Sequence, residues 1–174
     1  MRGYRKRPGA QGFSVPLVGA SLFFIISLFL FASYKNSAYQ QAKKEIYSLY
    51  TANRAFDLDE VYQDGLTAIY AKEYGKTATE AGCEALEQTG LPYVLLLSQF
   101  SAPVERVYVT NCQLSETGRE KKARTYDYTV SVRFCLEKGD EVLAPEKTMD
   151  FHGTVVMKKK GWFRWLLDGV TLGE

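Results

Sequence analysis

The sequence has few of the side chains that bind metals or build disulfide frameworks. Its 174 residues include one histidine and three cysteines, Cys83, Cys112 and Cys135. These residues are scattered along the chain, so they do not form a closely spaced set of four zinc ligands. Three cysteines also allow at most one disulfide within the chain. We therefore expect no metal site and no cofactor.

A strong basic excess and a glycine-rich phosphate loop are also missing. The formal net charge is +2, and the first seven residues hold four basic side chains and no acid, which leaves −2 for the remainder. A nucleic-acid-binding domain usually carries a clear positive excess, so no nucleic-acid partner is expected. Gly139, Gly153 and Gly161 stand singly, as turn or packing glycines do, and lack the spacing of a phosphate-binding loop.

Charged residues are absent from Pro8 to Tyr34, and the densest apolar run there reads VPLVGASLFFIISLFLFAS. About 20 helical residues span a hydrocarbon core roughly 30 Å thick. We predict a transmembrane helix over residues 13–34 that anchors the chain in the lipid bilayer. The alternative is a cleaved secretory signal, but the apolar run exceeds the roughly 7–15 residues of a signal core. No small-x-small cleavage site follows it.

The flanks of this segment predict the topology of the chain. A basic tail before a span favours a cytoplasmic N-terminus, so residues 1–12 form a cytoplasmic tail. Residues 35–56 form a stalk or first helix, and residues 57–174 form an extracytoplasmic α+β domain. The predicted location is the plasma (cytoplasmic) membrane, crossed once, with the C-terminal domain outside the cytoplasm.

Helical periodicity extends to about residue 100. The stalk carries an apolar stripe at Ala42, Ile46, Leu49 and Phe56. A second helix is expected within residues 57–75, and a third begins near Thr77, which has capping-box spacing to Glu80. Cys83 falls on the apolar side of this third helix, as a buried thiol. The run YVLLLSQF fits either a short buried helix or a strand.

After Pro103 the period changes to two, which is typical of strands with one buried face. Strands are expected over 104–114, 123–137 and 147–158, with a loop over 115–122. The second is the clearest, since six apolar or aromatic residues alternate with polar ones: Tyr126, Tyr128, Val130, Val132, Phe134 and Leu136. These strands and a last one after Gly161 predict an antiparallel sheet of about four strands.

The stretch MKKKGWFRWLLDGV permits two interpretations. Its lysines and tryptophans suit a patch that binds a membrane or nucleic acid, and they also suit a hairpin with glycine at a left-handed position. We favour the hairpin, with Lys158 paired with Trp162, because this register keeps the apolar residues of both strands on one face. It leaves Trp162 and Leu166 on the outer face as candidate partner contacts, and it places His152 opposite Asp168.

The apolar strand, the Lys/Gly turn and the Trp-led strand with Gly161, Trp162 and Trp165 resemble the end of nuclear-transport-factor-two-like (cystatin-like) domains. In that superfamily a curved sheet wraps helices to form a cone. The resemblance covers roughly residues 40–172. It implies an α+β fold in which an N-terminal transmembrane helix precedes helices packed on the curved sheet. Among single-span members, the layout is similar to assembly proteins of bacterial conjugation (type IV secretion) channels.

Three functions stay open. The favoured one is a non-enzymatic interaction or assembly module of a membrane complex, such as a conjugation-type secretion channel, whose partners are other subunits or further copies of the chain. The second is an enzyme using His152 with Asp168 or Asp150, since superfamily enzymes work in the mouth of the cone. The third is a cone that binds a small apolar ligand, with pocket candidates Tyr126, Tyr128, Phe134, Phe151 and Trp165.

Overall fold

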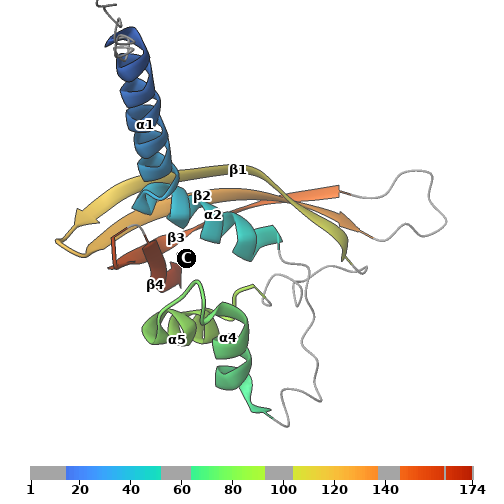
Figure 1. Cartoon of the computed structure of the whole chain (residues 1–174). Helices are drawn as coiled ribbons and strands as arrows, with labels where there is room; N and C mark the ends of the chain where they lie inside the picture. The colour runs from blue at the N-terminus through green and yellow to red at the C-terminus, as the bar shows by residue number, and fades with distance from the viewer. Residues whose placement is uncertain (1–14, 52–63, 93–103, 137–145, 163, 174) are drawn as a thin grey trace, which may run out of the picture. The chain divides into compact units, whose positions relative to one another are not determined.

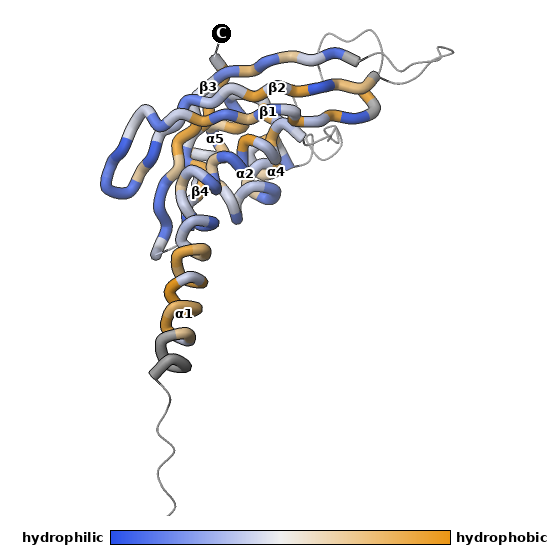
Figure 2. Tube along the Cα trace, turned by 90° about the horizontal axis from the view of Figure 1, so that it is seen from above, coloured by the Kyte–Doolittle hydropathy of each residue, from blue (hydrophilic) through white to orange (hydrophobic). Residues whose placement is uncertain are grey.

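The computed structural model describes residues 15–51, 64–92, 104–136, 146–162 and 164–173, except for the side chains of residues 15–19, 105, 136 and 146 (Figure 1). The chain forms two compact units, Met1–Tyr34 and Lys35–Glu174. In the first, α1 (Val15–Lys35) is a helix of 21 residues. Figure 2 shows that most of its residues are hydrophobic, and its described side chains are almost all exposed.

Membrane crossing by α1 stays a prediction. Over the part of the chain that the structure describes, no single helix has both the length and the hydropathy of a span. The helix pair Ala20–Lys35 and Ala38–Thr51 meets both conditions together, by length and composition.

The second unit is an α+β domain, as predicted. Its strands form one antiparallel sheet in the order β1-β2-β3-β4, which Figure 1 shows to be curled. The strands are β1 (Val104–Arg119), β2 (Ala123–Leu136), β3 (Glu146–Lys160) and β4 (Arg164–Leu172). The described helices of this unit are α2 (Ala38–Thr51), α4 (Leu66–Tyr74) and α5 (Glu80–Thr89).

The predicted alternation of β2 is confirmed, because its inward residues from Tyr126 to Phe134 are all buried. Asp127 and Arg133, on the opposite face, are exposed. The pairing of β1 with β2 contains three irregularities, at Val104/Arg106, Val109/Asn111 and Glu116/Gly118. One face of the sheet therefore supplies the core, and the outer strand β1 is repeatedly bulged.

Helix α2 is part of this core. Ala42, Ile46 and Leu49 of the predicted stripe are at most 1% exposed, and Phe56 lies outside the described residues. The Tyr128 hydroxyl donates its hydrogen to the Thr171 carbonyl oxygen at 3.0 Å. It therefore accepts the hydrogen bond from the Tyr50 hydroxyl, which lies 3.0 Å away. Burial raises the pKa of both phenols, so this buried chain of hydroxyls stays protonated.

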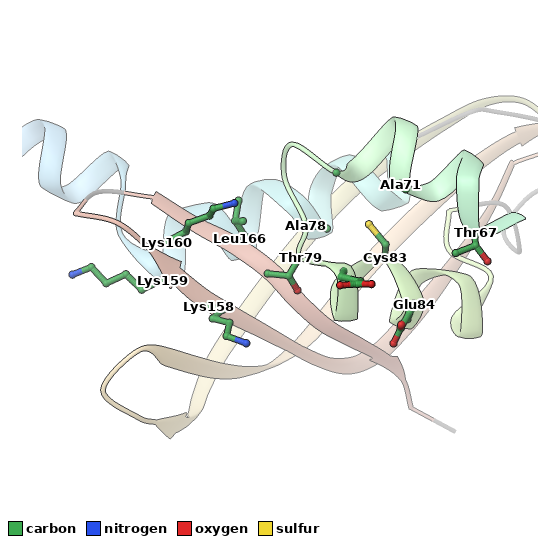
Figure 3. Close-up of a pocket in the computed structure, with 12 residues that line it drawn as sticks. Thr67, Ala71, Ala78, Thr79, Cys83, Glu84, Lys158, Lys159, Lys160 and Leu166 are labelled. Carbon is green, nitrogen blue, oxygen red and sulfur yellow. The ribbon is translucent and has the colours of Figure 1, made fainter.

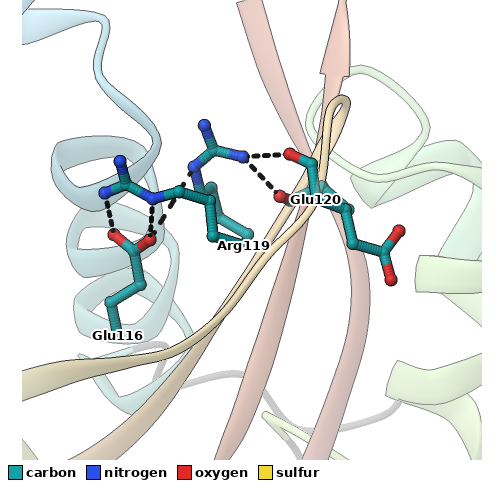
Figure 4. Close-up of polar contacts among 5 residues, drawn as sticks. Glu116, Arg119 and Glu120 are labelled. Atoms are coloured by element: carbon teal, nitrogen blue, oxygen red, sulfur yellow. Dashed lines mark hydrogen bonds and ion pairs between the residues drawn. The ribbon is translucent and has the colours of Figure 1, made fainter.

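The hairpin between β1 and β2 differs from its prediction. The loop expected over 115–122 is mostly strand, and the turn is confined to Glu120–Lys122. Polar residues on both faces of this segment hide its strand character in the sequence. Arg119 forms a 2.6 Å ion pair with Glu116 on the same strand, and Arg124 of β2 approaches the same carboxylate at 3.9 Å (Figure 4).

The hairpin between β3 and β4 is confirmed, but its predicted register is wrong. Lys158 pairs with Leu166 instead of Trp162, because β3 continues to Lys160, which pairs with Arg164. Gly161 takes the expected left-handed conformation, with φ 74°. A bulge between Val156 and Met157 then shifts the pairing by one more residue.

Candidate functional site

A surface pocket of about 670 Å³ lies between the two helices α4 and α5 and the β3–β4 hairpin (Figure 3). Each element contributes a small number of side chains. The wall from α4 is Thr67, Ala71 and the following Gly75; the wall from α5 and its N-terminal turn is Ala78, Thr79, Glu80, Cys83 and Glu84; the hairpin supplies Lys158, Lys159, Lys160 and Leu166. We call this pocket the helix–hairpin groove.

The groove exists because the segment before α5 is attached to the edge of β4. Thr79 donates its backbone N–H to the Leu167 carbonyl at 2.8 Å, and Leu167 donates to the Thr77 carbonyl at 2.9 Å. This pairing forms an isolated parallel bridge at Ala78. One turn later, a Cβ on Gly82 would lie 2.2 Å from the Leu167 carbonyl oxygen. Only glycine lets α5 approach the strand this closely.

Thr79 and Asp168 hold the start of α5 in place. Thr79 is the N-cap, and its hydroxyl accepts a hydrogen bond from the Gly82 backbone N–H at 3.1 Å. The same hydroxyl donates to Asp168 at 2.6 Å, and the Lys158 ammonium lies 3.4 Å from that carboxylate. The sequence prediction placed this cap at Thr77. That prediction is wrong because the chain is still paired with β4 there.

The floor of the groove is apolar, and it includes the buried thiol of Cys83. Leu166 is 3% and Cys83 7% exposed. The Cys83 sulfur lies 3.8 Å from the Tyr70 carbonyl oxygen, and burial raises the pKa of the thiol. A protonated, buried thiol is a weak nucleophile, so the predicted buried thiol is confirmed.

The rims of the groove carry opposite charges. Glu80 and Glu84 lie along α5, whereas Lys158, Lys159 and Lys160 follow β3. Charges at a rim contribute orientation and association rate more than affinity. An apolar floor between an acidic and a basic rim therefore suits a ligand with an apolar face flanked by charge.

The predicted ligand-pocket residues lie elsewhere, on the concave side of the sheet. Tyr126, Tyr128 and Phe134 are at most 2% exposed. Tyr50 of α2 stacks near Phe151, with ring centroids 5.3 Å apart. The fifth candidate, Trp165, is half-buried, with the Arg124 guanidinium 5.5 Å from its ring centroid. These side chains pack against one another and α2, and they do not line the helix–hairpin groove.

The predicted pairing of His152 with Asp168 is wrong. The His152 carbonyl accepts a hydrogen bond from the Gly173 backbone N–H at 2.8 Å, and its Nδ1 atom lies 3.1 Å from the Thr129 hydroxyl. Asp168 instead caps α5 through Thr79. Asp150 is exposed on the same strand as His152. The register shift in the hairpin thus separates the two side chains that the enzyme hypothesis needed together.

The two residues predicted to contact a partner on the outer face, Trp162 and Leu166, differ in solvent exposure. Trp162 is 85% exposed at the hairpin turn, whereas Leu166 is buried in the groove floor. The prediction for Leu166 is wrong because this residue lies in the groove beside α4 and α5, whereas its neighbour Leu167 is buried in the main core. Sequence reasoning missed the groove, and its signal was the small residues Ala78, just before α5, and Gly82 and Cys83, within α5.

No protein-family model and no curated protein matches the chain. Among solved structures, one described as "Ntf2 like protein involved in plasmid conjugation" is similar, with a TM-score of 0.41 and 12% sequence identity. The match covers 79% of this chain and 50% of that one, so this chain spans half the length of that structure.

Proposed function

We propose that the protein is a membrane-anchored interaction module that binds a segment of a partner protein in the helix–hairpin groove. The observation that carries this proposal is the groove itself, an apolar floor between rims of opposite charge. An amphipathic helix has the matching chemistry, since an apolar stripe lies between charged flanks. The partner is another subunit of a membrane complex or a second copy of the chain.

Anchoring by α1 is part of the proposal. A helix of 21 residues is about 31 Å long, close to the thickness of a hydrocarbon core. Its residues before Lys35 carry no charge, and four basic residues precede them. These features support a single pass with residues 35–174 outside the cytoplasm. A place in a conjugation-type secretion channel is the specific form of the proposal, and it rests on the resemblance of the sequence layout.

An apolar small molecule is the second candidate ligand. The groove has about 670 Å³, within the range of small-molecule sites. Its open shape between charged rims favours a peptide segment, whereas a small apolar ligand binds better in an enclosed cavity that removes it from water. The thiol of Cys83 in the groove floor gives no support to an enzymatic role, because burial raises its pKa.

Site-specific photocrosslinking in intact membranes tests this function. A photoreactive residue at Ala71, in the groove wall, is expected to crosslink to a defined membrane protein or to a second copy. The same residue at Asp127, exposed on the polar face of the sheet, is the control and is expected to give no such product.

A charge reversal sharpens the test. Glu84→Lys is expected to lower the crosslinking yield at Ala71 several-fold, since Glu80 and the new lysine cancel and the α5 rim loses its net negative charge. Glu73→Lys, the same change on an exposed α4 residue outside the groove, is expected to leave the yield unchanged. Equal yields from both photoreactive positions, or equal effects of both reversals, would contradict docking in the groove. A small-molecule adduct alone would favour the second candidate.

A further inference from the structure

The turns of the two hairpins lie side by side and form one basic surface. The Lys159 backbone N–H donates to the Lys122 carbonyl at 2.7 Å, and Ala123 pairs with Lys158 across β2 and β3. Lys121, Lys122, Lys159, Gly161 and Trp162 line a shallow depression there. We call the surface made by Lys121, Lys122, Lys159, Lys160 and Trp162 the basic tip.

The basic tip has more positive than negative charge, since Glu120 is the one acidic residue in the described part of its two turns. Nearby, Arg119 and Arg124 share the Glu116 carboxylate, and Lys158 approaches Asp168. Within the described parts of the chain, no ion pair involves Lys121, Lys122 or Lys160. The chain beyond its first seven residues has a net charge of −2. Positive charge is thus concentrated here against the overall balance.

Trp162 adds a second, independent feature. Its side chain is 85% exposed, the largest value among the exposed large apolar residues described. It follows Gly161, whose φ of 74° makes the tight turn that presents it. Indole rings combine an apolar body with one N–H donor and are enriched where water meets lipid headgroups. An exposed tryptophan among lysines therefore suits a surface that is both apolar and anionic.

The basic tip also lies at the end of the domain where the chain enters it. The domain begins at Lys35, directly after the apolar segment. Four residues later, the Tyr39 ring packs edge-on against Tyr126, with centroids 6.0 Å apart. Tyr126 is only four residues from the β1–β2 turn, about 13 Å along the strand. Figure 1 shows the start of α2 and this hairpin at the same end of the sheet.

We propose that the basic tip binds the anionic phospholipid headgroups of the membrane in which the chain is anchored. The lysines attract the negative surface, their stems allow the ammonium groups to reach it, and Trp162 inserts at headgroup depth. This contact holds the domain at a fixed orientation to the bilayer, and because Lys159 and Lys160 also form the basic rim of the helix–hairpin groove, it places that rim beside the membrane surface. The inference rests on the proposed anchoring and adds a second attachment to the membrane.

Tryptophan quenching by brominated lipids tests the inference on the full chain. The chain is reconstituted in nanodiscs of phosphatidylcholine alone or with phosphatidylglycerol, and the Trp162 signal is obtained by subtracting that of Trp162→Phe. Quenching is expected only in the anionic discs, and high salt is expected to abolish it. Lys121→Gln with Lys122→Gln, two exposed lysines outside the groove, is expected to weaken docking about five-fold for each lysine.

The matched control removes the same charge from the rest of the domain. Lys72→Gln with Lys147→Gln changes two exposed lysines on α4 and on the opposite end of β3, and it is expected to leave quenching intact. Equal quenching in both disc types, or equal loss in both double variants, would overturn the inference. Quenching by a single-stranded oligonucleotide in the neutral discs, lost in the tip variant, would also overturn it in favour of a nucleic-acid surface.

Resistance to alkaline extraction separates the two proposals. A chain that stays in neutral membranes after extraction but shows no lipid-dependent quenching contradicts the basic tip alone. A chain released from the membranes by extraction contradicts the anchoring on which both proposals depend.

Discussion

Glu45 is the buried carboxylate of α2. It lies three residues after Ala42 and four before Leu49, so it faces the core and is only 9% exposed. Burial raises its pKa, and Lys44 and a hydrogen bond from Thr77 partly offset this effect. A carboxylate in such a place costs stability when it is charged. Glu45 is not part of the apolar stripe predicted from the sequence, and the structure shows how little solvent reaches it.

Glu45→Gln is expected to raise the unfolding midpoint of the full chain at neutral pH. Burial raises the pKa of Glu45 in the folded state, so Glu45 loses its proton at a lower pH in the unfolded chain than in the folded one. The stability of the folded state therefore falls as the pH rises from the unfolded-state pKa through the folded-state pKa. The gain from glutamine is therefore largest at pH 7 and shrinks toward about pH 4. Thermal unfolding across this range measures it. Glu84→Gln, on an exposed side chain, serves as control, and a gain that is independent of pH would contradict the explanation.

At the scale of elements, the sequence predicted the type of each described helix and strand better than their partners. Alternation identified the buried face of β2 because every second residue from Tyr126 to Phe134 is apolar or aromatic. The same period of two cannot determine the register of β3 and β4. The predicted partner of Lys158 was Trp162 and the observed partner is Leu166. This shift of four residues keeps each side chain on the same face of the sheet, so the apolar pattern fits both registers. The bulge at Val156 and the burial of Leu166 under α4 and α5 depend on tertiary packing.

The contact of α5 with β4 gives a prediction at this scale. Gly82→Ala is expected to lower the free energy of unfolding by about 1–3 kcal/mol, because its methyl group meets the Leu167 backbone. This loss would exceed the roughly 1 kcal/mol that alanine gains over glycine inside a helix. Denaturant unfolding in detergent measures both effects. In the control Gly169→Ala, the new Cβ would lie 3.7 Å from Val156, an ordinary contact, and little change is expected.

A stabilised Gly82→Ala variant would show that the helix can move away from β4 without cost. In that case the helix–hairpin groove would not have the fixed shape that the proposed docking requires. The crosslinking yield at Ala71 in this variant then reports directly whether the groove and the helix attachment are coupled.

At the scale of the whole molecule, the proposed topology places the two ends of the chain on opposite sides of a membrane. A cysteine at Lys147, which is exposed on β3, is expected to react with a membrane-impermeant maleimide in sealed right-side-out vesicles. A cysteine at Arg5 is expected to react only after permeabilisation, because the basic tail stays in the cytoplasm. The parent chain gives the background of the native cysteines. Labelling in the reverse order would contradict the topology.

The bulged edge of the sheet has a consequence for how copies of the protein meet. An edge strand with a regular row of open N–H and C=O groups invites another sheet to add to it, and bulges interrupt that row. The segment at Thr77–Thr79 occupies the β4 margin, and β1 is interrupted three times along its pairing with β2. Continuous strand-to-strand growth into fibres is thereby discouraged at both margins, so assembly of this protein is expected to proceed through side-chain surfaces.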